Sequence, residues 1–467
     1  MLTYFPKFFT SKSIACYAAT LALVSLAFMS HVLPFQFILF GFVEVAVFFV
    51  YSNRLTMQWQ RLSPMAFSKK LFSTTAVIRV VYVVFIYIYY LEMTGQPHAY
   101  QAGDELIYQG VASVWHDYDF DEFRKNVKTY IDISDSGYHW WLGFEYMLLG
   151  TNVLPARLIK CFIDAYSCVL IYRLATRNFG EAAGRMAAVF YMLMPNAWFY
   201  CGVTLKETEM AFMVILFAER ADLAFRSPQI KIKDLLAPLA VVVVMFAFRT
   251  ALAAVLAATI GVALVFSSKK QLNMGKKILY ATIFAIWMFL TIGVELFQET
   301  QWMYENYAEN QKASYEWRAE REGGNTFAKY ASATLFAPLI FTIPFPTMVN
   351  VPYQENQMML NGGNFIKNIM SGFTIFAVFL LVFRKQWREH VLILALMCGY
   401  LVVLVFSNFA QAERFHFPVL ALELMFAAYG ITQVTVRQKR WFSFWLIGLV
   451  LANLVWAWVK LAGRGMA

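Results

Sequence analysis

Apolar stretches about as long as a membrane-spanning helix recur along almost the whole chain, and they restrict its fold more than any other feature. Of the 467 residues, 60% are hydrophobic and only 15% are charged. A soluble domain has about 45–50% apolar and about 25% charged residues. The excess of apolar residues is too large for one globular core, so it must face lipid. We therefore predict an all-α polytopic membrane protein.

The apolar stretches predict about 13 transmembrane helices. They cover residues 13–32, 34–51, 72–92, 153–175, 183–201, 207–225, 235–248, 250–266, 278–297, 366–384, 390–407, 416–434 and 441–460. The seventh and eighth are too short to cross a hydrocarbon core of about 30 Å, so we expect a hairpin with Arg249 at its tip. Residues 334–352 contain four prolines, which predicts a broken or re-entrant segment.

The basic residues predict the orientation. If the N-terminus faces the cytoplasm, every predicted inner loop carries Lys or Arg, whereas the outer loop 93–152 is rich in acids, as the positive-inside rule requires. Lys460 and Arg464 near the predicted outer C-terminus depart from the rule. The net charge of +10 is scattered between apolar stretches and forms no basic stripe, so we expect no nucleic-acid partner.

Two acidic residues follow the third predicted span. Asp104 and Glu105 would lie at the outer interface, where a lipid head group and a water-soluble acceptor can meet. A carboxylate there can act as a general base towards an acceptor hydroxyl or amine. The alternative is an ordinary solvated acid at the end of a helix.

Three basic residues lie at the same predicted outer face. Lys206 precedes a helix whose first backbone amides would suit a phosphate, although it can also pair with Glu207. Arg249 and Arg414 lie close to the apolar zone, where ionisable residues tend to be functional. Glu413 is an alternative, structural partner for Arg414. Because three cations on one face repel one another, we expect them to converge with Asp104 on one anion-binding cavity.

Other polar residues carry weaker signals. Arg157, Lys160 and Asp164 share one predicted span, where Lys160 and Asp164 are spaced for an ion pair. Asp117 and Asp119 belong to an acidic loop that could bind a divalent cation, but solvated carboxylates explain it as well. The histidines show no metal-ligand spacing, so we expect no metal or other cofactor.

Several short motifs occur in an order that resembles the GT-C superfamily of membrane glycosyltransferases. The branch it resembles contains the bacterial protein mannosyltransferases and the lipid A aminoarabinose transferases. The motifs are Asp104-Glu105-x-x-Tyr108, Gly137-Tyr138, Ala156-Arg157, Met194-Pro195, Leu205-Lys206-Glu207, Arg249, Pro344-Phe345-Pro346 and Arg414-Phe415-x-x-Pro418. The resemblance covers about residues 93–435. His139-Trp140-Trp141-Leu142 stand where the family has Pro-Pro-Leu, and two additional spans precede the family's first.

The resemblance implies a GT-C-like bundle with amphipathic outer-loop helices. Residues 1–70 would form two additional transmembrane helices, 71–435 the catalytic module with outer loops 93–152 and 298–365, and 436–467 a C-terminal transmembrane helix. It also implies a multi-pass protein of the bacterial cytoplasmic (inner) membrane, with its active site facing the periplasm or exterior.

The activity implied is that of an inverting glycosyltransferase, which moves a sugar from a polyprenyl-phosphate donor to a glycan, lipid or protein acceptor. By this resemblance Asp104 is the base, with Glu105 as its substitute. Lys206, Arg249 and Arg414 would bind the donor phosphate. The implied substrate-binding residues are Tyr108, Asp135, Tyr138, Arg157 and Glu207.

Two other functions fit parts of the sequence. A polysaccharide polymerase or ligase also uses polyprenyl-linked sugars, but it would be expected to have a histidine in its large outer loop, and residues 298–333 contain none. A transporter or flippase predicts charges at mid-membrane depth and paired broken helices. The sequence instead favours charges gathered at one face.

Overall fold

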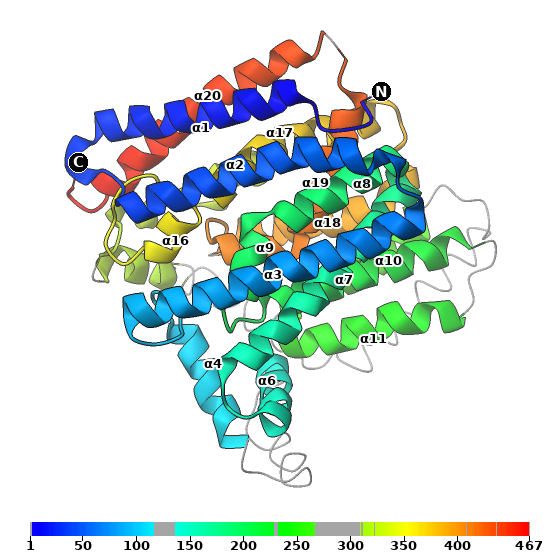
Figure 1. Ribbon diagram of the computed structural model, residues 1–467, viewed down its shortest axis with the longest axis horizontal. Coiled ribbons are helices and arrows are strands. Elements are labelled where there is room, and N and C mark those ends of the chain that lie inside the picture. The colour runs from blue at the N-terminus through cyan, green and yellow to red at the C-terminus, as the bar shows by residue number, and fades with distance from the viewer. Residues whose placement is uncertain are drawn as a thin grey trace.

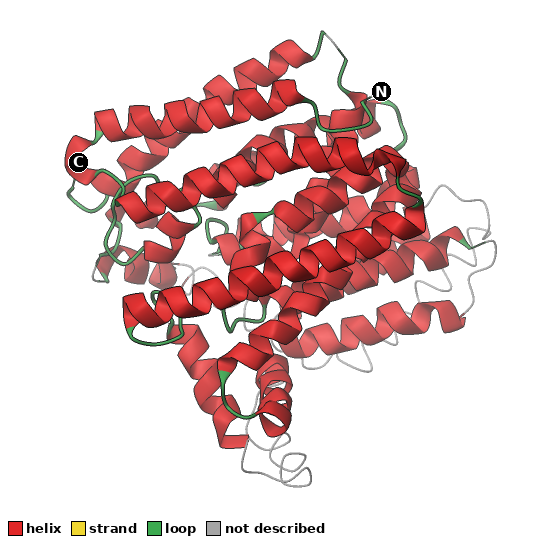
Figure 2. Cartoon of the chain, viewed as in Figure 1, coloured by secondary structure: helices red, strands yellow, loops and turns green. Residues whose placement is uncertain are grey.

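The described part of the chain is built from helices. The computed structural model describes residues 2–115, 136–227, 232–266, 309, 312–321, 323–407, 409–435 and 437–466 (Figures 1 and 2). The longer helices are α1 (Lys7–Ala27), α2 (Phe35–Gln58), α3 (Pro64–Thr94), α4 (Gly103–Val114), α6 (Ser136–Leu149), α7 (Val153–Phe179), α8 (Glu181–Leu193), α10 (Glu207–Arg226), α11 (Ile232–Phe248), α12 (Thr250–Phe266), α17 (Asn361–Phe383), α18 (Val391–Phe406), α19 (Glu413–Gln433) and α20 (Lys439–Ala462). Short helices are α9 (Pro195–Cys201), α15 (Ala333–Phe336) and α16 (Glu355–Met359), with 3-10 turns at Met29–His31, Trp59–Arg61, Thr326–Tyr330, Ala337–Leu339 and Trp387–His390. The prediction of an α-helical fold is confirmed for these residues.

Seven of the described helices are long and apolar enough to cross a membrane, which supports the predicted membrane character. They are α1, α2, α3, α17, α18, α19 and α20, where α2 and α18 are extended by adjoining 3-10 turns. The helices α11 and α12 are apolar but shorter, and only Arg249 separates them, as the hairpin prediction required. The long helices α7 and α10 carry several charged residues and are not among the seven. The predicted span 278–297 lies outside the described residues.

The predicted span 183–201 is interrupted. Helix α8 ends at Leu193, Met194 adopts an extended conformation with ψ 118°, and α9 starts at Pro195. A proline disfavours helical geometry in the residue before it but suits the first position of a helix. Pro195 therefore separates two helices within this apolar stretch.

The long helices run side by side across the molecule (Figure 1). In this view α1 and α20 form one edge, and α4 and α6 project from the opposite edge. Helices α8 and α19 are buried over nearly their whole surface, whereas α1, α3 and α20 bury a single face. The core thus lies around α8 and α19, and the outer helices expose the apolar surface that a bilayer would cover.

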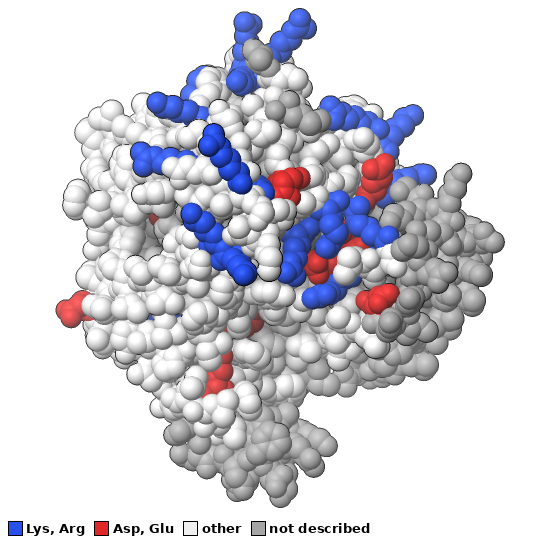
Figure 3. Space-filling model, turned by 45° about the vertical axis from the view of Figure 1, so that its right-hand side comes forward, with Lys and Arg blue, Asp and Glu red and all other residues white. Residues whose placement is uncertain are grey.

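The two ends of the bundle differ in charge. The end at which α1 starts, α2 finishes and α3 starts carries exposed Lys7, Arg54, Lys69 and Lys70. Figure 3 shows many basic and few acidic side chains on this side. We call it the basic end, and the opposite end, where α3 leads towards α4, the cavity end. The basic end is the one predicted to face the cytoplasm.

Buried ion pairs inside the bundle correct the expectation that charges gather at one face. Arg79 of α3 contacts Asp164 of α7 with Nε–Oδ2 2.6 Å, and both side chains are fully buried. Lys367 of α17 lies 3.8 Å from a carboxylate oxygen of Glu423 in α19. The predicted Lys160–Asp164 pair is wrong, because Arg79 is the ion-pair partner of Asp164. A charge buried at such a position requires an opposite charge and hydrogen bonds.

The predicted broken segment 334–352 is largely non-helical beyond residue 339. Side chains of α17 satisfy its backbone: Lys367 Nζ donates to the Ile343 carbonyl at 2.6 Å, and Asn368 Nδ2 donates to the Pro344 carbonyl at 3.0 Å. On its other side the Asn350 amide donates to the His31 carbonyl at 2.9 Å. Irregular backbone within an apolar protein needs such partners in place of water.

Candidate functional site

A cavity of about 500 Å³ lies at the cavity end of the bundle. Its walls come from the start of α4, the chain before α10, the segment 317–321, the region of α16 and the start of α19. Polar and charged side chains that line it include Gln101, Asp104, Glu105, Arg321, Glu413 and Arg414. Residues far apart in the sequence thus form one polar site in an otherwise apolar protein.

Asp104 and Arg414 meet at this cavity. Arg414 Nη1 donates to Asp104 Oδ2, joining the first turn of α4 to the first turn of α19. The side chain of Asp104 is 48% exposed and that of Arg414 is 28% exposed. Both groups are therefore paired with each other and still accessible to a ligand. The predicted convergence is correct for these two residues.

Glu207 connects the two predicted phosphate-binding arginines. Its Oε1 lies 3.2 Å from Arg414 Nε and 3.7 Å from Arg249 Nη2. The Phe415 ring also contacts both guanidinium groups, with centroid distances of 4.3 Å to Arg249 and 5.2 Å to Arg414. The buried Glu207 carboxylate offsets the repulsion between the arginines. A bound anion is therefore not needed to hold them together, which corrects part of the sequence argument.

Lys206 is not among the residues that line this cavity. Its Nζ donates to the carbonyl of Phe248 at 2.8 Å, and the side chain is buried. Phe248 is the last residue of α11, where backbone carbonyls lack partners within the helix and attract a cation. Lys206 and Arg249 thus do not line the cavity with Asp104. Glu207, the alternative partner of Lys206, contacts the two arginines.

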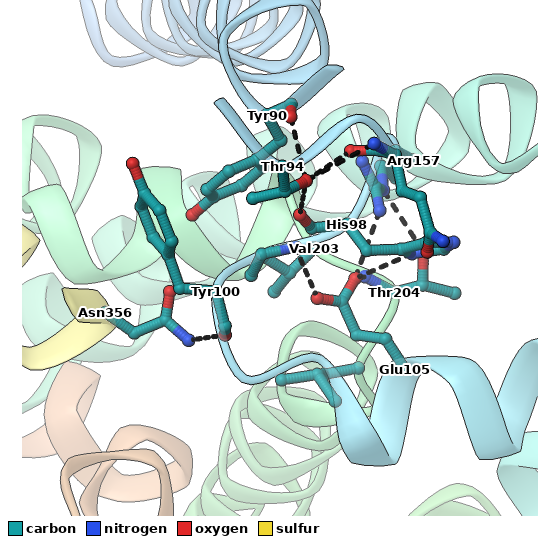
Figure 4. Close-up of polar contacts among 12 residues, drawn as sticks. Tyr90, Thr94, His98, Tyr100, Glu105, Arg157, Val203, Thr204 and Asn356 are labelled. Carbon is teal, nitrogen blue, oxygen red and sulfur yellow. Dashed lines mark hydrogen bonds and ion pairs between the residues drawn. The ribbon is translucent and has the colours of Figure 1, made fainter. Parts of the chain in front are cut away.

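The Glu105 carboxylate accepts several hydrogen bonds, although Glu105 directly follows the accessible Asp104 in the sequence (Figure 4). It accepts hydrogen bonds from Arg157 Nη2 at 3.0 Å, the Thr204 amide at 2.7 Å and the Ala99 amide at 3.1 Å. Burial favours a higher pKa for Glu105, but contacts with His98, Arg157 and Thr204 outweigh burial and lower the pKa below its usual value. Glu105 is therefore an ionised, structural carboxylate that joins α4 to α7 and to the loop before α10.

Lys160 holds the same loop from the other side. Its Nζ donates to the carbonyls of Val203 at 3.0 Å and Leu205, and it lies 3.6 Å from a carboxylate oxygen of Glu209. Arg157 Nε adds a hydrogen bond to the Thr204 hydroxyl at 3.1 Å. The loop that precedes Glu207 is thus fixed by side chains of α4 and α7.

Two further predicted substrate-binding residues are packed together. Tyr108 of α4 and Tyr138 of α6 are buried, with ring centroids 5.0 Å apart in a T-shaped arrangement. Lys160 Nζ lies 5.5 Å from the centre of the Tyr138 ring. These tyrosines pack α4 against α6, and neither is among the residues that line the cavity.

The remaining predicted residues concern metal and substrate binding. Asp135, Asp117 and Asp119 lie outside the described residues. Within the described ranges, no group of three or more His, Cys, Asp or Glu side chains could hold a metal ion.

Sequence reasoning missed the polar cluster around Glu413. Its carboxylate accepts hydrogen bonds from Asn196 Nδ2 at 2.7 Å and from the Tyr200 hydroxyl, and Asn196 also donates to Asn364 at 3.2 Å. Asn196 and Tyr200 belong to the short α9. The signal was present in the proline that starts α9 and in the position of Glu413 beside Arg414.

Comparison with family models, with curated proteins and with solved structures finds no match to this chain.

Proposed function

We propose that this protein is an inverting glycosyltransferase of the GT-C type that takes a sugar from a polyprenyl phosphate. The observation that carries the proposal is the half-exposed Asp104, paired with Arg414 at a polar cavity. Of the carboxylates that line this cavity, Glu105 is fully engaged and Glu413 accepts two hydrogen bonds. Asp104 is the one with a large exposed fraction, so it is the carboxylate best placed to take an acceptor proton.

In the proposed reaction an acceptor oxygen or nitrogen attacks the anomeric carbon of the donor sugar. The new glycosidic bond forms as the bond from that carbon to the phosphate oxygen breaks, which inverts the configuration. The acceptor proton moves to Asp104, and the bonding electrons leave with the polyprenyl phosphate. Arg414 then stabilises the negative charge that develops on this leaving group.

The pairing of Arg414 suits this role. A donor phosphate competes with Asp104 for the guanidinium, because phosphate oxygens are strong acceptors for arginine. Transfer of Arg414 from Asp104 to the phosphate would free the carboxylate to act as a base. Glu207 and Phe415 would hold Arg414 in position during this exchange.

The surface of α4 supports access from a bilayer. Leu106, Ile107 and Val114 of α4 are large exposed apolar side chains. Glu105 and Tyr108 on the same helix are buried against the protein. An amphipathic helix of this kind lies in the interfacial region of a membrane. A donor tail could then stay in lipid while its phosphate reaches Arg414, with the cavity end facing the periplasm or exterior.

Substitution of the proposed base tests the function. The purified protein is incubated in detergent with a panel of polyprenyl-phosphate sugars and candidate glycan, lipid and protein acceptors, and release of lipid phosphate is measured. We expect Asp104→Asn to reduce turnover by about 100-fold or more, with donor binding retained, because the acceptor proton loses its base. The matched control is Glu92→Gln, which alters an exposed acid at the end of α3. Turnover near that of the wild type in Asp104→Asn would refute the assigned base.

Transport or flipping of a lipid-linked sugar is the second candidate, because the pairs Arg79–Asp164 and Lys367–Glu423 are buried inside the bundle. Transporters place ionisable groups at such depths. A flippase would move a labelled polyprenyl-phosphate sugar between the leaflets of a vesicle without releasing lipid phosphate. Measuring the movement between leaflets and the release of lipid phosphate on one preparation therefore distinguishes the two functions. A polymerase or ligase would use the same donors and is distinguished by an acceptor that is itself a polyprenyl-linked or lipid-linked glycan.

A further inference from the structure

Three basic side chains line the cavity or contact the segments next to it. Arg321 lines the cavity beside Trp317, with its guanidinium 4.8 Å from the centre of the indole ring. Lys460 of α20 donates to Gln357 Oε1 at 2.8 Å, and Gln357 lines the same cavity. Arg464, one helical turn after Lys460, donates from Nε to the Gly323 carbonyl at 2.9 Å. We call Arg321, Lys460 and Arg464 the second basic group.

The second basic group has no acidic counterpart among the residues that the structure describes. Lys460 is buried, and its hydrogen-bond acceptors are the neutral amides of Gln354 and Gln357. The side-chain donors of Arg464 reach only backbone carbonyls. Glu320, the residue before Arg321, pairs with Lys329.

The electrostatic environment of Arg464 shows that these charges act on one another. Burial lowers the pKa of Arg464 to about 10, and the positive charge of Arg321 contributes to this lowering. Like charges one helical turn apart, as Lys460 and Arg464 are, also repel. The hydrogen bonds that Lys460 and Arg464 donate do not by themselves require charged side chains. A neutral donor could bind the same amide and carbonyl oxygens. The guanidinium groups of Arg321 and Arg464 therefore carry positive charges that no acid among the described residues neutralises.

The position of these residues in the membrane topology adds a separate argument. Lys460 and Arg464 are the basic residues that depart from the positive-inside rule at the predicted outer side. The structure places them at the cavity end, beside the residues that line the cavity, and not at the basic end. These basic residues lie on the side where the rule disfavours them, and they have no acidic partner among the described residues. Binding of an anion would explain their position.

We propose that Arg321, Lys460 and Arg464 form a second anion site, which binds a phosphate group other than that of the sugar donor. Arg414 and Arg321 line the same cavity of about 500 Å³, so two phosphate groups could be held together in it. Arg321, the most exposed of the three, makes the direct contact. Arg464 supplies positive potential behind it, and Lys460 donates a hydrogen bond to Gln357 of the cavity lining. The phosphate could belong to the acceptor or to the head group of an anionic lipid. Only the assignment to an acceptor rests on the proposed glycosyltransferase function.

Binding of inorganic phosphate tests the site without any turnover. The full chain is placed in nanodiscs of phosphatidylcholine, and phosphate affinity and stoichiometry are measured by calorimetry. We expect Arg321→Gln to weaken one class of phosphate sites by about tenfold, the effect of one lost charge-assisted contact. Arg414→Gln should leave that class intact and weaken another. Lys329→Gln is the matched control, because Lys329 is an exposed residue of the same region whose charge Glu320 already neutralises.

The lipid composition then separates the two sources of phosphate. If an anionic head group occupies the site, nanodiscs containing phosphatidylglycerol should abolish the Arg321-dependent binding of inorganic phosphate. If the acceptor supplies the phosphate, that binding should persist in both compositions. Unchanged phosphate binding in Arg321→Gln would overturn the second anion site. Failure of Asp104→Asn to slow transfer would instead overturn the proposed reaction and leave this result standing.

Discussion

At the scale of single residues, Asp104 and Glu105 show how neighbours acquire different roles. Successive residues of an α-helix point about 100° apart, so one can face a cavity while the other faces the protein. Asp104 is half exposed beside Arg414, whereas Glu105 is buried among Arg157, Thr204 and Ala99. The two carboxylates should therefore respond differently to substitution.

We predict that Glu105→Ala destabilises the protein, in contrast to Asp104→Asn. Removing one partner of a buried ion pair leaves the Arg157 charge uncompensated and costs about 3–5 kcal/mol. Because the pKa of Glu105 is lowered in the folded state, its contribution is present above its unfolded pKa and is lost as the pH falls below it. The midpoint of thermal unfolding in detergent measures the effect, with Glu92→Ala as the exposed control. An unchanged midpoint would contradict the structural role of Glu105.

For Glu145 of α6 we predict that stability changes with pH in the direction opposite to that for Glu105. Burial, and then the negative charge of Glu209, raise the pKa of Glu145 from 4.5 to about 8. The folded state holds a proton that the unfolded state releases, so stability falls as the pH rises from about 4.5 to about 8, by up to about 1.4 kcal/mol per pH unit. Glu145→Gln should remove this loss, making the variant more stable than the wild type at pH 9 and similar to it at pH 5. If the wild type and Glu145→Gln had the same difference in unfolding midpoint at pH 5 and at pH 9, Glu145 would not be protonated in the folded state.

The sequence located Asp104, Glu105 and Arg414 because charged residues next to apolar stretches are conspicuous. It could not decide which acid is accessible, because that depends on the rotation of α4 against α7. It also assigned Lys206 to a phosphate, whereas the structure shows a hydrogen bond from Lys206 to the end of α11. Which of several possible partners a long cationic side chain contacts is decided by tertiary packing.

At the scale of elements, the contact between α2 and α17 depends on glycine. A side-chain carbon added at Gly362 would lie 2.6 Å from the Gly41 carbonyl and 2.6 Å from the Glu44 carboxylate. Glu44 also accepts a hydrogen bond from the Gly363 amide at 2.9 Å, so it caps the start of α17 from within α2. Small residues allow helices in a membrane to approach in this way.

We predict that Gly362→Ala destabilises the protein by about 1–3 kcal/mol, because the backbone of α2 must move away from the added methyl group. Gly448→Ala in α20 is the matched control, since nothing lies within 4 Å of a carbon added there. Thermal unfolding of both variants in the same detergent measures the difference. Equal stability of the two variants would mean that the α2–α17 contact adapts without cost.

Hydropathy predicted most helices of the described chain closely, because length and apolar composition suffice for that purpose. The ends of α12, α17 and α18 lie within a few residues of the predicted ones, whereas α1 and α3 start earlier and the span 183–201 is interrupted. The sequence did not predict which helices pack against one another. A helix that is apolar on every face carries no stripe to indicate its neighbour, so the α2–α17 contact follows only from three-dimensional packing.

At the scale of the whole molecule, the separation of the basic end from the cavity end predicts the topology. Two positions at opposite ends of the bundle are suitable for single cysteine substitutions. They are Gln96, after α3, and Lys385, after α17. We expect a membrane-impermeant maleimide to label Gln96→Cys in intact cells and Lys385→Cys only after permeabilisation. The wild type provides the background from its five native cysteines, four of which are buried. The reverse labelling pattern would place the cavity in the cytoplasm and rule out a donor from the outer leaflet.

The pairing of α1 with α20 has a consequence for biosynthesis. Lys12 Nζ donates to Ser443 Oγ at 2.6 Å across a separation of 431 residues. At about 5–20 residues per second, a ribosome needs about 20–90 s to make the intervening chain. During that time α1 lacks the helix that finally covers one of its faces. Interim contacts with lipid or with the insertion machinery must take its place, and a ribosome that stalls before α20 leaves this face of α1 open to other proteins.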